Sequence, residues 1–378
     1  MKTNLFNTLC SLCMGAMTLL LSLSACQKGS LGDDPSANGE AVIELNMHSV
    51  NPLTKAVGDP VTGLAEENTF YTLDIMVFDT SKDGGILEYC SHDDYQEGAV
   101  SATKRIVTNP GPKTIFVYAN MPTTQLRYLT TLEGCVNRQQ SYENNARGHL
   151  IMSATKSFVI PTTGEMDGSE TNAEISLELV RDVSRVSVKQ VVNAIEPVGQ
   201  RQIKLSGIYL NNVPKIYDPR VDDPDAQEFW TWDDDERPAD VVSMMSVVPG
   251  FDFPYSMISA SNRTWTGTNY HLYGLTNTHS ESADGINDSL TKVIIELTEG
   301  SDNNLKTYYY PIAIRGMMAN CTYEIESVTI SRLGSDDPQI YVKNAVTQAS
   351  IVAKAWDGSS ILGDFNYNFD PDNGTATF

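Results

Sequence analysis

Short extended segments with alternating apolar and polar residues recur along this chain, and they constrain its fold more than any other feature. Residues 41–47 are one such segment, in which Ala41, Ile43, Leu45 and Met47 share one face. Similar strand patterns occur at residues 69–79, 113–120, 203–214, 291–298, 306–316 and 320–334. Turns with Gly, Pro and Asn separate them, and residues 123–133 have helical spacing. The pattern predicts an all-β fold with one short helix, arranged as two tandem antiparallel β-sandwiches.

The length of the chain, 378 residues, favours two domains. Residues 193–202 lack periodicity and contain Pro and Gly. We therefore expect an N-terminal sandwich at residues 56–195 and a C-terminal sandwich at residues 196–348. Residues 173–192 read as one long strand or two consecutive strands, and their apolar phase shifts across Arg181 and Asp182. That shift predicts a bulge or a bend.

The N-terminus reads as an export signal. Lys2 precedes an apolar run at residues 14–23, which is too short for a comfortable membrane span. The run ends in Leu-Ser-Ala-Cys at residues 23–26, which resembles the bacterial lipobox. We predict that residues 1–25 are a lipoprotein signal peptide and that Cys26 becomes the lipidated N-terminus. The alternative is a plain secretory signal with an incidental cysteine.

Charge and cysteine content narrow the choice of partners. The formal net charge is -22, so nucleic acid and anionic lipid headgroups are poor partners. After removal of the signal and lipidation of Cys26, Cys90, Cys135 and Cys321 remain. An odd number leaves at least one thiol outside a disulfide, and the spacing does not select a pair. Zinc or redox chemistry has little support, because no Cys-x-x-Cys pair remains.

Catalytic motifs are missing from the sequence. It has no HExxH, no GxSxG and no Gly-rich phosphate loop. The segment SATK at residues 101–104 and 153–156 matches the Ser-x-x-Lys of penicillin-recognising enzymes, but the companion motifs are not in suitable places. We therefore predict no enzymatic activity and no cofactor.

An acidic insertion spans residues 217–240 and has Phe229, Trp230 and Trp232 in its middle. A solvated surface loop with aromatic side chains is the simplest interpretation. A calcium site is an alternative, because carboxylates are dense there, although the spacing is not that of an EF-hand. A platform of Trp230 and Trp232 for stacking sugars is a further alternative.

The two ends of the chain carry regular strand patterns. Lys55 lies in a loop rich in Gly and Pro directly behind the first strand. Near the C-terminus, residues 350–356 are strand-like and include Ile351 and Ala353. Residues 365–369 then place Phe365, Tyr367 and Phe369 on one face. Such a segment should not stay unpaired, because an exposed apolar strand promotes aggregation.

These features together resemble the fimbrillin family, the major subunits of the type V pili of Bacteroidales. The resemblance covers nearly the whole chain. It is carried by the order of the motifs LSAC, LTKAVGD, LDIMVFD, TIFVYANMP, ISLELVRDVSRVSV, IKLSGIYLNNVP, RGMMANCTYEIESVTISRLGSDDP and AKAWD.

The resemblance implies a function and an assembly route. Such subunits are exported as lipoproteins to the outer membrane, and an extracellular trypsin-like protease cuts the loop behind the first strand. On this chain the cut falls between Lys55 and Ala56, and the tether with the removable strand occupies residues 26–55. Ile43, Leu45 and Met47 would leave with it. The commoner residue at the cut is Arg, so a strictly Arg-specific protease could fail here.

The vacated groove would accept a strand from another subunit. The resemblance places this donor strand at residues 349–378, with Ile351, Ala353, Phe365, Tyr367 and Phe369 on it. It implies transthyretin-like sandwiches, a homopolymer in an extracellular fimbrium, and adhesion to a host or bacterial surface ligand. A stalk subunit is the first interpretation, and a tip or anchor subunit is the nearest variant. An anchored glycan-binding lipoprotein is the alternative from another class.

Overall fold

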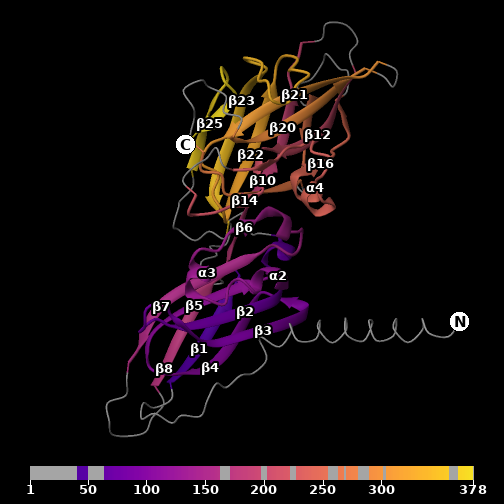
Figure 1. Cartoon of the computed structure of the whole chain (residues 1–378). Coiled ribbons are helices and arrows are strands. Elements are labelled where there is room, and N and C mark those ends of the chain that lie inside the picture. Colours follow the sequence, from indigo (N-terminus) through magenta and orange to yellow (C-terminus); the bar gives the residue numbers. More distant parts are fainter. Residues whose placement is uncertain are drawn as a thin grey trace, which may run out of the picture.

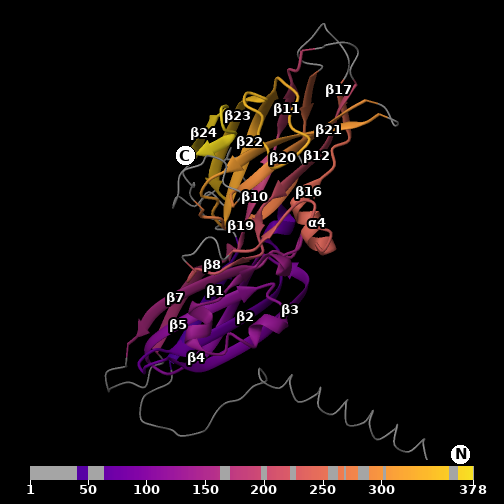
Figure 2. The same cartoon turned by 45° about the horizontal axis from the view of Figure 1, so that its top comes forward.

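The computed structural model describes residues 41–49, 64–161, 171–196, 202–221, 227–253, 263–267, 270–279, 289–300, 304–356 and 365–377. Strands dominate these residues, and they form two lobes joined at a narrow waist (Figure 1). The two lobes are also distinct in the turned view of Figure 2. The predicted all-β class with tandem β-sandwiches is therefore confirmed.

The first lobe packs a three-stranded sheet, in the order β4-β1-β8, against a five-stranded sheet, in the order β3-β2-β5-β7-β9. Its strands are β1 (Ala41–His48), β2 (Phe70–Asp79), β3 (Ile86–Ala99), β4 (Ser101–Thr108), β5 (Gly111–Ala119), β7 (Met152–Ile160), β8 (Thr171–Glu178) and β9 (Val180–Arg181). The short helix η1 (Ala65–Asn68) precedes β2.

Strand β2 shows why the five-stranded sheet is apolar on both faces. Leu73, Ile75 and Val77 point into the core between the two sheets. The alternate residues Met76 and Phe78 point outward, where α2 (Thr123–Leu126) and α3 (Leu132–Val136) cover them. The sequence predicted one helix across residues 123–133. The structure has two short helices instead, and the Thr131 hydroxyl caps the second by accepting a hydrogen bond of 3.0 Å from the Gly134 N–H.

The second lobe is built from strands hydrogen-bonded in the order β16-β12-β20-β21-β25-β24-β23-β22-β10-β19. Its longer strands are β10 (Val183–Val188), β11 (Gln190–Asn193), β12 (Ile203–Asn211), β19 (His271–Leu275), β20 (Thr291–Glu299), β21 (Lys306–Ile314), β22 (Cys321–Ile330) and β23 (Val346–Ala355). The C-terminal strands are β24 (Phe365–Asp370) and β25 (Thr375–Thr377). Shorter elements are α4 (Ala239–Met245), β13 (Val213–Pro214), β15 (Phe229–Trp230), β16 (Ser246–Val247), β17 (Phe251–Phe253) and β18 (Thr264–Thr266).

The C-terminal hairpin joins the two halves of the second lobe. Strand β24 runs antiparallel to β23, and β25 runs antiparallel to β24 and parallel to β21. In Figure 1 this hairpin forms the left edge of the second lobe, at the marked C-terminus. The last residues of the chain therefore complete the second sandwich.

The chain crosses between the lobes at Asp182. Strand β9 pairs with β7 of the first lobe, and β10 pairs with β19 and β22 of the second. The predicted bend at Arg181 and Asp182 is thus the crossing itself. The range 56–195 expected for the first sandwich includes β10 and β11, which pair with strands of the second lobe. The crossing at Arg181 and Asp182 contains no Gly or Pro, so composition pointed to residues 193–202 instead.

Additional contacts close the waist. The two-residue strand β6 (Gln140–Ser141) pairs with β14 (Ile216–Tyr217). Tyr142, in the helix η2 (Tyr142–Asn144), is buried in the core of the second lobe, and its hydroxyl donates a 2.6 Å hydrogen bond to the Tyr273 carbonyl. The lobes are therefore joined by packing as well as by the chain.

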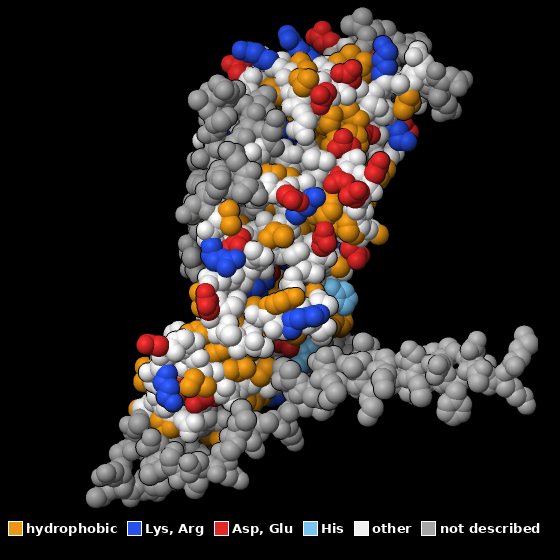
Figure 3. Space-filling view, in the orientation of Figure 1, with side chains coloured by type: hydrophobic (Ala, Val, Ile, Leu, Met, Phe, Trp, Pro, Cys, Tyr) orange, Lys and Arg blue, Asp and Glu red, His pale blue; other side chains and the backbone are white. Residues whose placement is uncertain are grey.

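The structure forms no disulfide among Cys90, Cys135 and Cys321, all of which it describes. In the part of the chain that the structure covers, no group of His, Cys, Asp and Glu side chains is arranged to hold a metal ion. No described helix is long and apolar enough to span a membrane. Acidic and basic side chains are interspersed on the face shown in Figure 3.

Candidate functional site

Strand β1 is the middle strand of its sheet. It runs antiparallel to β4, from Ala41 opposite Thr108 to His48 opposite Ser101, and parallel to β8 in the same full register. Since neighbouring strands lie about 4.8 Å apart, removal of β1 would leave a gap of about 9.6 Å between β4 and β8. Strands β4 and β8 could not hydrogen-bond to each other across that gap, so the backbone groups on their facing edges would stay unpaired.

The inward face of β1 is part of the core of the first lobe. Ala41, Ile43, Leu45 and Met47 are each at most 1% exposed, and they pack with residues of both sheets. Burial of an aliphatic side chain of this size contributes about 1.5–3 kcal/mol. Three such side chains lost together would expose an apolar groove lined by Ile106, Ile175 and Leu177.

The outward face of β1 carries Glu44, Asn46 and His48, which are partly exposed, and Val42, which is buried. Glu44 lies 3.6 Å from Arg105, and both side chains are about half exposed. The Thr103 hydroxyl donates a 2.9 Å hydrogen bond to the Asn46 side chain. Surface contacts of this kind contribute little to stability, so the inward side chains and the two ladders hold the strand.

The end of β1 is tied to two other segments. The Ser49 side chain is fully buried, and its hydroxyl lies 2.5 Å from the Asn68 carbonyl in η1 and 3.2 Å from the Val100 carbonyl. The Leu179 N–H, just after β8, donates a 2.8 Å hydrogen bond to the His48 carbonyl. Strand β1 therefore ends at the waist.

The predicted modification and processing residues are not placed by the structure. Cys26, Lys55 and Ala56 lie outside the described residues, which begin at Ala41 and resume at Leu64 after Ser49. The lipidation and the cut stay predictions. Ile43, Leu45 and Met47 lie together on one strand, as the alternation indicated.

The predicted donor residues divide into two groups. Ile351 and Ala353 lie on β23 and are buried in the core of their own lobe, at 1% and 5% exposure. Both therefore belong to the core of their own lobe in this structure, and their assignment to a donor strand stays a prediction. Phe365 and Tyr367 lie on β24, opposite Ala353 and Ile351 in the ladder, and Phe369 packs half-buried against the core. Alternation alone could not separate a strand of the chain's own sheet from one meant for another subunit.

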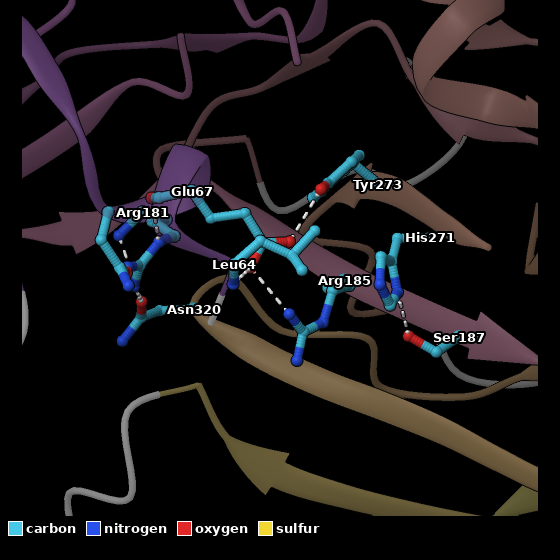
Figure 4. A network of polar contacts seen from close by, with 9 residues as sticks. Leu64, Glu67, Arg181, Arg185, Ser187, His271, Tyr273 and Asn320 are labelled. Carbon is cyan, nitrogen blue, oxygen red and sulfur yellow. Dashed lines mark hydrogen bonds and ion pairs between the residues drawn. The ribbon is translucent and has the colours of Figure 1, made fainter. Parts of the chain in front are cut away.

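A buried polar network lies at the waist between the two lobes (Figure 4). Glu67 of η1 is 1% exposed, and its carboxylate accepts 2.7 Å hydrogen bonds from Arg185, from the Tyr273 hydroxyl and from the Leu64 N–H. Buried charges need such partners, because an unpaired one is costly. No local sequence pattern indicates this network, and the phase shift at Arg181 is the only signal near it.

Arg181 and Trp356 extend the network into the second lobe. Arg181 Nε donates a 2.9 Å hydrogen bond to the Glu67 carbonyl, and its guanidinium also bonds the side chains of Asn68 and Asn320. The guanidinium carbons of Arg181 and Arg185 lie 4.8 and 5.2 Å from the centre of the Trp356 ring. Both contacts are cation–π interactions, which are strongest when desolvated.

The aromatic residues of the acidic insertion are largely packed against the second lobe. Trp230 is 5% exposed, and Lys215 Nζ lies 4.3 Å from the centre of its ring. Trp232 lies against Tyr209 and Tyr309, with ring centres 5.2 and 5.5 Å apart. Trp230 therefore cannot stack on a sugar, which corrects that part of the glycan interpretation. Residues 222–226 of the insertion lie outside the described part.

A second buried carboxylate lies on the helix-covered face of the first lobe. Asp74 on β2 is 3% exposed, and its Oδ1 lies 2.6 Å from Nδ1 of His92 on β3. Burial raises the pKa of Asp74 to about 6, although the His92 contact opposes the rise. Burial disfavours the charged imidazole, but the Asp74 and Asp94 carboxylates raise the pKa of His92 above its usual value. Both pKa values are therefore raised, so the folded protein favours the protonated forms of this pair.

Comparisons with known proteins support the fold. No protein-family model matches the chain, and no curated protein does either. Among solved structures, a candidate cell-adhesion protein from Bacteroides eggerthii aligns with a TM-score of 0.58 and 15% identity, covering 85% of this chain and 98% of that one. Another from Parabacteroides distasonis aligns with a TM-score of 0.53 and 14% identity, covering 85% and 98%. A fimbrilin from Porphyromonas gingivalis aligns with a TM-score of 0.49 and 15% identity, covering 79% and 92%. The first two likenesses show that this fold is shared.

Proposed function

We propose that this chain is a structural subunit of an adhesive fimbrium. It is exported as a lipoprotein through Cys26, cut after Lys55 and polymerised by strand exchange. The observation that carries the proposal is the position of β1, which is the middle strand of its sheet and fills the core of the first lobe. A strand in that position can be replaced only by another strand with a similar apolar face.

Three further facts support the proposal. The order of motifs along the chain resembles that of fimbrillins, and the fold is shared with candidate cell-adhesion proteins of related bacteria. The C-terminal hairpin, β24 with β25, lies at the left edge of the second lobe in Figure 1, away from the first-lobe sheet that contains β1. In our proposal the donor lies within this hairpin, because β23 belongs to the core of its own lobe.

The first test is the N-terminal residue of the protein recovered from the cell surface, read by mass spectrometry. We expect Ala56. Acylated Cys26 as the only N-terminus would contradict a stalk subunit, and would favour an anchor subunit or an anchored glycan binder. Replacing Lys55 by Gln should block processing and polymer formation together. The matched control is Lys82→Gln, since Lys82 lies in an exposed turn of the described structure.

The second test is removal of the donor. Deletion of residues 358–378 removes β24 and β25 but leaves β23 and Trp356 in place. We expect processed monomers that no longer form ladders on a gel. A folded, processed deletion variant that still polymerises would contradict a donor in the hairpin. Deletion from residue 349 is unsuitable, because it removes Ile351 and Ala353 from the core of the second lobe.

A further inference from the structure

We propose that the waist network couples the first strand to the C-terminal hairpin, so that loss of β1 loosens the hairpin. This inference rests on the proposed function, because it describes how processing would regulate release of the donor. It is argued from a continuous series of contacts that starts at Ser49, where β1 ends, and finishes at Trp356, where β23 ends. Figure 4 shows the central part of that series.

The first link joins β1 to η1. Ser49 is fully buried, and its hydroxyl bonds the carbonyl of Asn68 at the end of η1. Ser49 precedes Lys55, so a cut after Lys55 removes this contact together with the strand. Helix η1 then loses a hydrogen bond at Asn68, the residue whose side chain bonds the Arg181 guanidinium.

The second link reaches Arg181 along the chain. The His48 carbonyl accepts a 2.8 Å hydrogen bond from the Leu179 N–H, two residues before Arg181. Strand β8, which ends at Glu178, has β1 as its parallel partner over its whole length. Loss of β1 therefore also frees the segment from which the Arg181 side chain extends. The two links converge on one guanidinium.

The third link joins Arg181 to the root of the hairpin. Trp356 is fully buried beneath Arg181 and Arg185, and its ring stacks on Tyr273 with centres 6.2 Å apart. Its backbone N–H donates a 3.1 Å hydrogen bond to the carbonyl of Asn320, whose side chain also accepts from Arg181. Trp356 directly follows β23 and precedes the hairpin in sequence. Greater mobility of the Arg181 side chain would thus weaken the contacts that hold Trp356 in place.

The hairpin is suited to respond. Strand β24 pairs with β23 through three residue pairs and β25 pairs with β21 through two, whereas β1 pairs with β4 and with β8 through eight each. A small change in the fixation of Trp356 can therefore alter how often the hairpin opens, because segments with few ladder bonds open locally at low free energy. Coupling of this type is reciprocal, so loosening Trp356 should also loosen β1.

The test uses the full chain that retains β1 and measures amide hydrogen exchange by mass spectrometry. Ser49→Ala keeps the strand but removes its contact with η1. We expect exchange in residues 365–377 to become about threefold to tenfold faster, in line with the loss of one hydrogen bond. Thr103→Val is the matched control: it removes a hydroxyl hydrogen bond to β1, at Asn46, outside the network. It should leave exchange in the hairpin unchanged.

A reciprocal variant gives the test a second arm. Trp356→Phe keeps an aromatic ring of smaller area under the two guanidinium groups, and we expect faster exchange in residues 41–48. Equal hairpin exchange in Ser49→Ala and Thr103→Val would overturn the coupling. Faster exchange in Ser49→Ala that is confined to residues 64–68, with no change in the hairpin, would also overturn the coupling. Polymerisation of the unaltered protein is read separately on gels, so strand exchange can stand while the coupling fails, or fail while the coupling stands.

Discussion

Strand β1 in the first lobe and the C-terminal hairpin of β24 and β25 in the second lobe are buried to different degrees. In the first lobe, β1 lies between two strands, and its inward side chains are at most 1% exposed. In the second lobe, the hairpin of β24 and β25 closes a seam. Ala376 is buried there, but Phe369 is only half-buried and Asn368 and Asp370 are exposed.

This difference indicates which end can move unaided. A strand held by two full ladders and a core face does not leave spontaneously, since both edges and the apolar groove would be exposed at once. A hairpin held by three residue pairs to β23 and two residue pairs to β21 has fewer ladder bonds, so it opens more readily by thermal fluctuation. In the assembly route that we propose, β1 thus needs a covalent cut before it can be replaced, whereas the hairpin needs only to be loosened.

The largest expected effect tests the difference in depth directly. Leu45→Ala should lower the free energy of unfolding by about 2–5 kcal/mol, because it leaves a cavity in a fully buried site. Phe369→Ala should cost clearly less, since Phe369 is only partly buried. Urea unfolding followed by far-ultraviolet circular dichroism compares the two. Equal losses would break the comparison between the lobes.

The next effect is a pH dependence of the free energy of unfolding that arises from Asp74 and His92, both in the first lobe. The pKa of Asp74 is raised to about 6, above its ordinary value of 3.8, so the folded state binds this proton more tightly than the unfolded state. Stability should fall by on the order of 2 kcal/mol as the pH rises from about 4 to about 6.5. The raised pKa of His92 extends the loss to higher pH.

Unfolding in urea at several pH values measures this slope. Asp74→Asn removes the titrating carboxyl group at nearly constant size and should flatten the dependence. An unchanged slope in that variant would show that other groups carry it.

A smaller effect sharpens the description of the seam. Ala376 on β25 is fully buried, and a larger side chain there should strain the packing. We expect Ala376→Leu to cost about 1–2 kcal/mol, at the low end of overpacking effects, because β25 can shift outward. The measurement is the shift of the thermal midpoint by calorimetry. A cost well above that range would mean that the seam is packed as rigidly as the first core.

The smallest effect concerns the outer face of β1. Glu44→Gln removes an ion pair with Arg105 in which both groups are about half exposed. The loss should stay below about 0.5 kcal/mol and should vanish in high salt. Paired urea titrations at low and high salt would show it. A large loss would mean that the outer face helps to hold the strand.

Much of this architecture could be predicted from the sequence. The all-β class and the first strand followed from a period of two, which requires only that one face of each strand be buried. The phase shift at Arg181 and Asp182 marked the place where the chain changes lobes. Alternation does not specify a strand's partner, so the pairing of β10 and β11 with the second lobe, and of β23 with β22 and β24, could not be predicted.

The sequence by itself determined which residues of this protein face a core, because the side-chain period of a strand is a local property. Only the tertiary structure decided where each strand lies in its sheet. It placed β1 in the middle of a sheet, β23 inside its own lobe and β24 with β25 at a seam. It also brought Ser49, Glu67, Arg181 and Trp356 together at the waist. These contacts join residues far apart in the chain, so no local pattern could record them.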